Sequence, residues 1–250
     1  MSKCFMSGCS LASYSPRLVE KTILYLKNIY PDLSTVQKCC GSPTLLMGET
    51  KNFEMRFSDL LWDINSCKTD ELIVACQNCY KLLKESKDFK VTSLWEILAK
   101  SEFLEDFKNK GKNSDVTFTI HHSCYSKKEA SIQENIKIIL NKLGYSYVEP
   151  EYISCCGQGG MAGATNPMIA KKITEKRINS FETQHVVTYC ASCKGSMSSS
   201  GAKAWHILDL FFGELINSRS EPPKDVSLAK SWLNRYTSKS KIEVIYDKKS

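Results

Sequence analysis

The apolar residues of this chain recur with two different periods, which predict helices and strands in alternation. An apolar residue returns every three or four positions over residues 19–30 and again over residues 53–64, as on one face of a helix. Short apolar runs at residues 4–6 and 72–75 are typical of buried strands. Strands that alternate with helices predict parallel pairing, with right-handed crossovers, and hence an α/β fold.

The second half of the chain repeats this plan. Residues 116–120 and 186–189 read as strands, and residues 132–143 have the apolar spacing of a helix that Gly144 ends. Trp205-His-Ile-Leu208 resembles Trp95-Glu-Ile-Leu98, so we expect the two tryptophans at equivalent places in the core. The pattern predicts two pseudo-symmetric lobes, each a small, mainly parallel sheet flanked by helices. The expected division is a first lobe at residues 1–103, a polar linker at residues 104–115, a second lobe at residues 116–216 and a basic tail at residues 217–250.

Ten of the twelve cysteines form two arrays of five with nearly matching intervals. Both arrays contain a Cys-Cys-Gly turn and close with Cys-x-x-Cys, and each group of cysteines follows a predicted strand. Because the carboxyl ends of parallel strands meet at one edge of a sheet, we expect each array to converge there. The first array is Cys9, Cys39, Cys40, Cys76 and Cys79, and the second is Cys124, Cys155, Cys156, Cys190 and Cys193.

Composition narrows the class of protein. With 250 residues and a hydrophobic fraction of 42%, the chain can bury one large or two small cores, which argues against disorder. No apolar run approaches the roughly 18 residues of a membrane span, and the start lacks the apolar region of a secretory signal. We therefore expect a cytoplasmic protein, whose reduced thiols bind metal rather than form disulfides.

The net charge of +7 is uneven, because residues 217–250 hold eight Lys/Arg against four Asp/Glu. We interpret this tail as a solvated segment that a few hydrophobic residues anchor. The alternative interpretation is a docking surface for an acidic partner. The sequence has no helix-turn-helix, zinc-finger or RNA-binding signature, so we expect no nucleic-acid partner. The expected anchors are Trp232, Val244, Ile245 and Tyr246.

The number of thiols in each array bears on the kind of metal. Neighbours such as Cys39 and Cys40 have Cα atoms about 3.8 Å apart, below the range of ordinary disulfides. A structural zinc site takes four ligands, which leaves one cysteine over in each array. Five thiolates suit a polynuclear iron–sulfur cluster better, although zinc at one or both sites stays open.

The first array has the order Cys-x29-Cys-Cys-Gly-x34-Cys-x-x-Cys, and the second has the order Cys-x30-Cys-Cys-Gly-x32-Cys-x-x-Cys. This repeated order resembles that of the Cys-Cys-Gly domain family. Its best-known member is the catalytic B subunit of heterodisulfide reductase, and relatives include iron–sulfur subunits of glycolate and lactate oxidation systems. The likeness spans about residues 4–210. It includes Phe5-Met-Ser-Gly-Cys9, Cys40-Gly-Ser-Pro43, Cys79-Tyr80 and Cys156-Gly-Gln-Gly-Gly160.

The resemblance implies an oxidoreductase subunit of anaerobic metabolism. Each array, with all five cysteines as ligands, would hold a non-cubane [4Fe–4S] cluster, and the pair would reduce a small-molecule disulfide. Since the chain has no ferredoxin-type cysteine run, electrons would come from partners, a ferredoxin-like iron–sulfur subunit and a flavoprotein subunit. Ser123 departs from the family, which often has proline there. Two alternatives to a disulfide-reducing subunit stay open. One is an electron-transfer subunit of lactate or glycolate oxidation, and the other is an interaction module stabilised by zinc.

A few further residues carry expectations of their own, and none is assigned a catalytic role. Gly41 and Gly157 would let the backbone turn tightly beside a cluster. His122, two positions before Cys124, reads first as a structural histidine and otherwise as a donor to the cluster. Cys4 and Cys67, outside the arrays, read as small buried hydrophobes.

Overall fold

The computed structural model describes residues 2–100, 107–158 and 161–247, with side chains as far as residue 242 apart from Lys241. By its internal contacts the chain forms two compact units. The first comprises Met1–Leu94 and Val226–Ser250, and the second comprises Trp95–Asp225. Residues 104–106 of the predicted linker lie outside the described part, whereas residues 107–115 belong to the second unit. The four-part division expected from the sequence stays a prediction.

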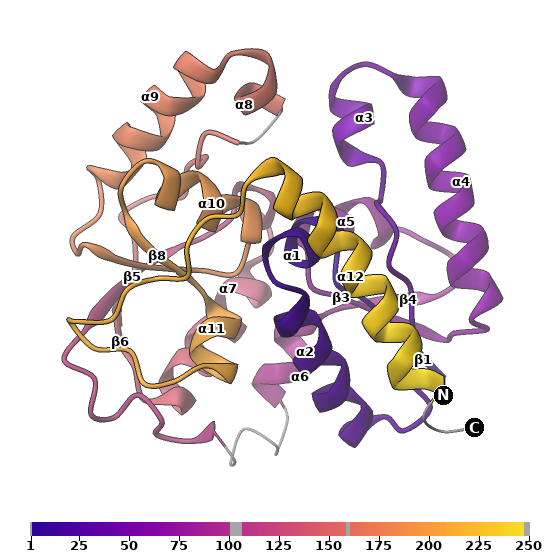
Figure 1. Ribbon diagram of the computed structural model, residues 1–250, viewed down its shortest axis with the longest axis horizontal. Coiled ribbons are helices and arrows are strands. Elements are labelled where there is room, and N and C mark those ends of the chain that lie inside the picture. Colours follow the sequence, from indigo (N-terminus) through magenta and orange to yellow (C-terminus); the bar gives the residue numbers. More distant parts are fainter. Residues whose placement is uncertain (1, 101–106, 159–160, 248–250) are drawn as a thin grey trace. The chain divides into compact units, whose positions relative to one another are not determined.

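The first unit alternates strands with helices, and the C-terminal helix belongs to it (Figure 1). Its elements are β1 (Lys3–Met6), α1 (Cys9–Tyr14), α2 (Pro16–Ile29), β2 (Ser34–Thr35), α3 (Ser42–Leu46), α4 (Thr50–Ser66), β3 (Glu71–Val74), α5 (Gln77–Leu83), β4 (Lys90–Ser93) and α12 (Leu228–Asp247).

The second unit follows nearly the same order. Helix α6 (Leu94–Lys100) leads into it from β4. Its further elements are β5 (Thr117–His121), the 3₁₀ turn η2 (Cys124–Ser126), α7 (Ala130–Leu143), β6 (Ser146–Val148), α8 (Ala162–Thr165), α9 (Pro167–Ile178), β7 (His185–Thr188), α10 (Ala191–Ser199), β8 (Lys203–His206) and α11 (Ile207–Phe212). The repeated order confirms the predicted duplication.

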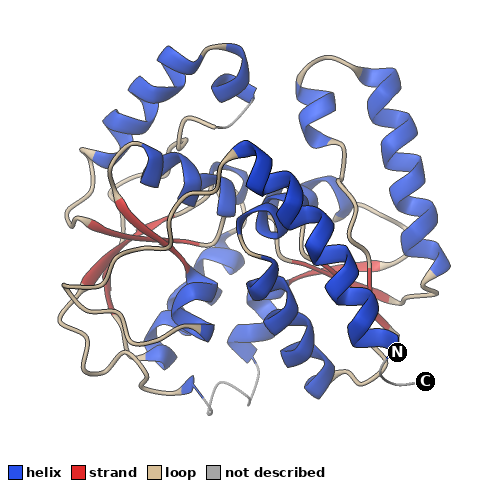
Figure 2. Cartoon of the chain, viewed as in Figure 1, coloured by secondary structure: helices blue, strands red, loops and turns tan. Residues whose placement is uncertain are grey.

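Each unit contains one four-stranded sheet in which all pairs are parallel. The strand orders are β2-β1-β3-β4 and β6-β5-β7-β8, so the same topology occurs twice. Figure 2 shows the strands of each sheet in red with helices around them. The register also repeats, because Met6 pairs with Val74 at the end of β1 and His121 pairs with Thr188 at the end of β5. These findings confirm the predicted α/β fold.

Local sequence explains where the long helices begin and end. Helix α2 starts at Pro16, and the side chain of Ser15 accepts a hydrogen bond from the backbone of Leu18. Asn166 and Pro167 start α9 in the same way. Helix α7 ends where Gly144 adopts the left-handed conformation, with φ of 79°.

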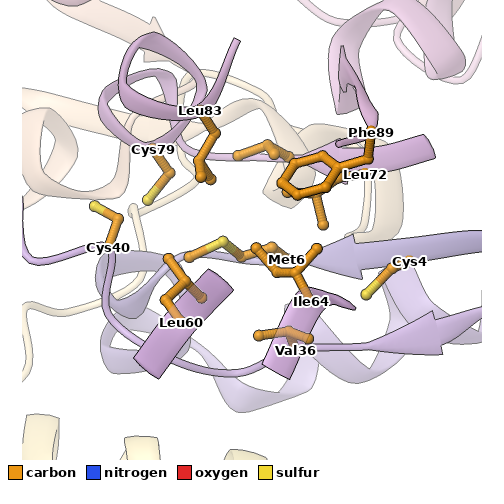
Figure 3. Packing of buried hydrophobic residues seen from close by; sticks show 11 residues of the cluster. Cys4, Met6, Val36, Cys40, Leu60, Ile64, Leu72, Cys79, Leu83 and Phe89 are labelled. Carbon is orange, nitrogen blue, oxygen red and sulfur yellow. The ribbon is translucent and has the colours of Figure 1, made fainter. Parts of the chain in front are cut away.

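The core beside the first sheet contains residues of the first cysteine array. Its cluster of buried side chains comprises Cys4, Met6, Val36, Cys40, Leu60, Ile64, Leu72, Val74, Cys79, Leu83 and Phe89. Figure 3 shows Met6 near the middle of this cluster, with Cys40 and Cys79 toward one side and Cys4 toward the other. The array is therefore set into the hydrophobic core, whose packing fixes its sulfur atoms.

The expected equivalence of Trp95 and Trp205 is wrong. Trp205 is the third residue of β8, whereas Trp95 is the second residue of α6. The paired register places Ser93 and His206 at equivalent ends of β4 and β8, so the counterpart of Trp95 is Leu208. Both tryptophans are buried, but Trp95–Leu98 lies wholly within α6, whereas Trp205–Leu208 spans the end of β8 and the start of α11.

The basic tail is largely exposed, as expected, but the expectation that Trp232 anchors it is wrong. Residues 228–247 form α12, which packs on α1 and α2 (Figure 1). The expected anchor Trp232 is 63% exposed, whereas Asn234 and Ser238 are buried. Asn234 donates a hydrogen bond to the backbone carbonyl of Ser13 at 2.7 Å, so polar contacts hold this helix in place. The side chains of Val244, Ile245 and Tyr246 lie outside the described part.

Within the residues that the structure describes, no helix combines the length and the apolarity needed to cross a bilayer.

Candidate metal centre

The first array is assembled at the carboxyl ends of β1, β2 and β3. Cys9 begins α1 directly after β1, Cys39 and Cys40 follow β2, and Cys76 and Cys79 lie at the start of α5 after β3. The Sγ atoms of Cys9 and Cys39 are 3.8 Å apart. Further thiol contacts join Cys39 to Cys40, Cys40 to Cys79, and Cys79 to Cys76. A continuous series of sulfur contacts thus links all five cysteines.

The second array has the same construction on the second sheet. Cys124 follows β5, Cys155 and Cys156 follow β6, and Cys190 and Cys193 lie at the start of α10 after β7. Thiol contacts join Cys124 to Cys155, Cys155 to Cys156, Cys156 to Cys193, and Cys193 to Cys190. The structure therefore brings together, within each unit, the five cysteines that the sequence groups.

Glycines shape the backbone at both arrays. Gly41 and Gly157 follow the paired cysteines with φ of 76° and 87°, a conformation that residues with a side chain rarely adopt. Gly8 also has a φ of 76°, and a Cβ atom built on it would lie 2.6 Å from Cβ of Cys76. Only glycine allows this approach of the β1–α1 turn to the sulfur atoms. Gly159 and Gly160 of the second motif lie outside the described residues.

Crowding opposes ionisation of most thiols in the arrays. A hydrogen bond to Cys39, together with burial, raises the pKa of Cys9 far above its ordinary value. The hydrogen bond to Cys39 also raises the pKa of Cys40 to about 12, whereas hydrogen bonds from Cys40 and Cys9 lower the pKa of Cys39. In the second array, the hydrogen bond to Cys155 raises the pKa of Cys156 to about 12. Five neighbouring thiolates need a positively charged centre among them, which a metal supplies.

A cavity of about 330 Å³ lies beside the first array. Cys9 and Cys39 line it on one side, and Trp232, Arg235 and Lys239 of α12 line it on the other. The positive charge of Arg235 adds to the lowering of the pKa of Cys39 by its thiol hydrogen bonds, and it opposes part of the rise in the pKa of Cys9. The outer sulfurs of this array therefore face a cavity whose lining includes the cationic side chains of Arg235 and Lys239, which the sequence did not predict.

The second array has a buried neighbour that sequence reasoning did not single out. One ring nitrogen of His121 and the sulfurs of Cys156 and Cys193 all lie within 4.8 Å of one another. His121 is fully buried and accepts a hydrogen bond at Nδ1 from Nε of Arg177, at 3.3 Å. Burial and the charge of Arg177 lower the pKa of His121 to about 3, so its ring is neutral at pH 7. His121 lies three residues before Cys124, and Met6 lies three residues before Cys9. This matching position in the two repeats was the signal in the sequence that could have identified His121.

His122 has structural partners. Its Nδ1 lies 3.1 Å from the hydroxyl of Tyr189, which also contacts the hydroxyl of Ser126 at 2.6 Å. Burial lowers the pKa of His122 to about 4, so the ring is neutral at pH 7 and forms no ion pair with Glu149, 3.9 Å away. The contacts favour the structural interpretation of this histidine.

Cys4 and Cys67 belong to neither series of array contacts. Cys4 is fully buried in β1, as expected, whereas Cys67 is half-buried at the end of α4. A hydrogen bond joins the two thiols to each other.

A family model for the cysteine-rich domain, CCG, matches the chain twice, at residues 4–84 and 118–198. Together the two matches cover more than half of the chain and include all ten array cysteines. Helix α12 lies outside both.

Curated relatives are similar over about three quarters of the chain. An uncharacterized iron–sulfur protein of Methanococcus maripaludis is 25% identical, over 76% of this chain and 40% of its own length. The D subunit of dihydromethanophenazine:CoB–CoM heterodisulfide reductase of Methanosarcina acetivorans is 24% identical, over 77% and 52%. The glycolate oxidase iron–sulfur subunit of Escherichia coli is 19% identical, over 78% and 53%. The chain thus spans about half the length, or less, of these relatives.

Among solved structures, an aspartate racemase of Picrophilus torridus aligns with 97% of this chain and 94% of its own. The TM-score of 0.35 and the 9% identity are too low to indicate a shared function.

Proposed function

Because this chain belongs to the cysteine-rich CCG domain family, we propose that it is an iron–sulfur oxidoreductase subunit in which each cysteine array holds one cluster. The observation that carries the proposal is the pair of complete arrays, each with five thiols in continuous contact at the carboxyl edge of a parallel sheet. A closed zinc site would leave one thiol of each array without a role. Five soft sulfur donors fit a cluster of several irons.

The ten array cysteines are the proposed ligands, and a non-cubane [4Fe–4S] core is the proposed cofactor at both sites. Such clusters supply single electrons when bound. Most of the array thiols are buried and need a cationic partner to ionise. The glycine turns beside them leave room for a bulky group. Both properties fit a resident cluster.

The proposed reaction is the reduction of a small-molecule disulfide. Cleavage of the S–S bond consumes two electrons and two protons and yields two thiols. A ferredoxin-like partner subunit, supplied in turn by a flavoprotein, is the proposed source of the electrons. The cavity beside Cys9 and Cys39 supports access of a small molecule to the first array. Similarity to a heterodisulfide reductase subunit supports the same reaction.

A second candidate is electron transfer in the oxidation of a 2-hydroxy acid, which similarity to a glycolate oxidase iron–sulfur subunit supports. In that role the chain accepts electrons from a flavoprotein and needs no disulfide. The two candidates share the proposed clusters and differ in the substrate.

The test begins with anaerobic purification and reconstitution, followed by iron and acid-labile sulfide analysis. Reduced viologen then serves as the electron donor for a panel of disulfides. Disulfide-dependent oxidation of the viologen would support the reductase. A loaded protein that is inactive with every disulfide, but accepts electrons from a co-purified glycolate- or lactate-oxidising flavoprotein, would establish the second candidate. Zinc without sulfide would overturn both.

A further inference from the structure

The two arrays differ in the residue that ends the first strand of each sheet. Met6 pairs with Val74 at the end of β1, and His121 pairs with Thr188 at the end of β5. Each lies three residues before the first cysteine of its array. The duplicated fold therefore places a thioether beside one array and an imidazole beside the other.

Hydrogen bonding determines which nitrogen of His121 carries the proton. Nδ1 accepts the hydrogen bond from Nε of Arg177, whose guanidinium keeps its protons. Because Nδ1 accepts this hydrogen bond, the ring proton lies on Nε2. That atom is buried and has no hydrogen-bond partner within the described residues. A buried N–H without an acceptor destabilises the fold, and a suitable acceptor would remove that cost.

Sulfur atoms that can accept a hydrogen bond lie close to this ring. A ring nitrogen of His121 lies within 4.8 Å of the sulfurs of Cys156 and Cys193, and these are proposed ligands. Arg177 holds the ring in place. Its own side chain is buried against Phe181 and Tyr152, with the guanidinium carbon 4.8 and 5.3 Å from the two ring centroids. The donor is thus preorganised beside the second array.

At the equivalent position of the first sheet the residue is Met6. Met6 packs in the same buried cluster as Cys40 and Cys79, the counterparts of Cys156 and Cys193 (Figure 3). A thioether carries no proton that it could donate.

We propose that His121 donates an Nε2–H hydrogen bond to sulfur at the second site and thereby raises the reduction potential of the cluster there. The inference rests on the proposed function, since it concerns the cluster that the second array holds. Hydrogen bonds to sulfur stabilise the more negative, reduced state, and they are among the properties that set cluster potentials. Arg177 is a positioning residue that fixes the tautomer of His121. The two sites are therefore not equivalent electron acceptors.

The test is a redox titration of the reconstituted protein followed by electron paramagnetic resonance, on His121→Met and the unchanged chain. His121→Met gives the second site the residue of the first. The expected result is full iron content, a lower midpoint potential for one cluster and an unchanged potential for the other. His121→Gln, which keeps an N–H donor, should recover part of the shift, and it serves as the second variant if the methionine variant does not fold.

His185→Met is the matched control. His185 begins β7 in the same sheet, stacks on Trp205 and also has a buried Nε2 without a partner within the described residues. It should leave both potentials unchanged. Unchanged potentials in His121→Met, or an equal shift in His185→Met, would overturn the inference alone. A protein that takes up no iron would overturn the proposed function, and the inference with it.

Discussion

The thiols of Cys4 and Cys67 are hydrogen-bonded to each other and take no part in the contacts that link the ten array cysteines. Cys4 lies in the middle of β1, and Cys67 ends α4. In Figure 3, Cys4 lies at the other side of the core cluster from Cys40 and Cys79. This pair therefore provides an internal comparison, because the same unit contains cysteines of the array and cysteines outside it.

The first prediction separates proposed ligands from bystanders. Cys156→Ser removes the sulfur that contacts both Cys155 and Cys193, so we expect it to lose about half of the bound iron and the magnetic signal of one cluster. Cys67→Ser should keep the full iron content and both signals. Iron analysis and electron paramagnetic resonance on anaerobically reconstituted protein measure this difference. Equal iron in the two variants would refute the ligand assignment.

The second prediction concerns the reactivity of Cys67. The hydrogen bond from Cys4 lowers the pKa of Cys67 to about 7, so about half of this thiol is ionised at pH 7. Without that donor its pKa should rise toward about 8.5, which lowers the thiolate fraction at pH 7 roughly fifteenfold. Cys4→Ala should therefore slow the alkylation of Cys67 by iodoacetamide, as followed by mass spectrometry from pH 6 to 9.

Cys4→Ser is the matched control, because its hydroxyl keeps a hydrogen-bond donor at this position. It should preserve most of the reactivity of Cys67. An alkylation profile for Cys67 with the same midpoint in all three proteins would show that Cys4 does not lower its pKa.

The third prediction concerns the approach of the β1–α1 turn to the first array. Gly8→Ala places a Cβ atom 2.6 Å from Cβ of Cys76, in a backbone conformation with φ of 76°. Gly48→Ala has a similar φ of 80°, and its Cβ meets nothing within 4 Å. Both variants should lose about 1 kcal/mol of stability from backbone strain. Only Gly8→Ala should also displace Cys76 and lose iron from one site, as iron analysis measures. Similar iron losses in the two variants would contradict this account.

The fourth prediction concerns Glu71, which bridges three strands of the first sheet. Burial raises its pKa, but hydrogen bonds from Lys3 and Thr92 outweigh burial and lower the pKa to about 2. A depressed carboxyl pKa stabilises the fold above the unfolded value of about 4.3, and this stabilisation is lost as the pH falls toward 2. Glu71→Gln should therefore cost about 1–3 kcal/mol at pH 7 and progressively less below pH 4.3.

Urea unfolding of both proteins in the same metal-loading state, from pH 7 to pH 3, measures the effect. Glu96→Gln is the control, because Glu96 forms a partly exposed pair with Lys100 and should change stability by less than about 0.5 kcal/mol. A cost for Glu71→Gln that does not depend on pH would contradict the charge-based explanation.

The sequence predicts most of the fold because hydrophobic periodicity and buried packing agree over most of the chain. Helices α2, α4 and α7 form where apolar residues recur at helical spacing. Helix α12 was not predicted because its side facing α1 and α2 is partly polar. It buries Asn234 and Ser238 while leaving Trp232 and Tyr236 exposed. A polar residue buried by a specific hydrogen bond leaves no periodic signal in the sequence.

The convergence of each cysteine array is predictable for a geometric reason, since the carboxyl ends of parallel strands share an edge. The residues that surround the arrays are harder to predict from the sequence. His121 and Met6 become comparable only when the strand register is known, and the contact between His121 and Arg177 depends on the packing of α9 against the sheet. Residues far apart in sequence, such as Arg235 near Cys9, give no local signal at all.

The most direct test of the central claim is the iron and acid-labile sulfide content of the anaerobically reconstituted chain. Two [4Fe–4S] clusters predict about eight iron and about eight sulfide per chain, with no dependence on added zinc. A colourless protein with about one zinc per array and no sulfide would contradict the account.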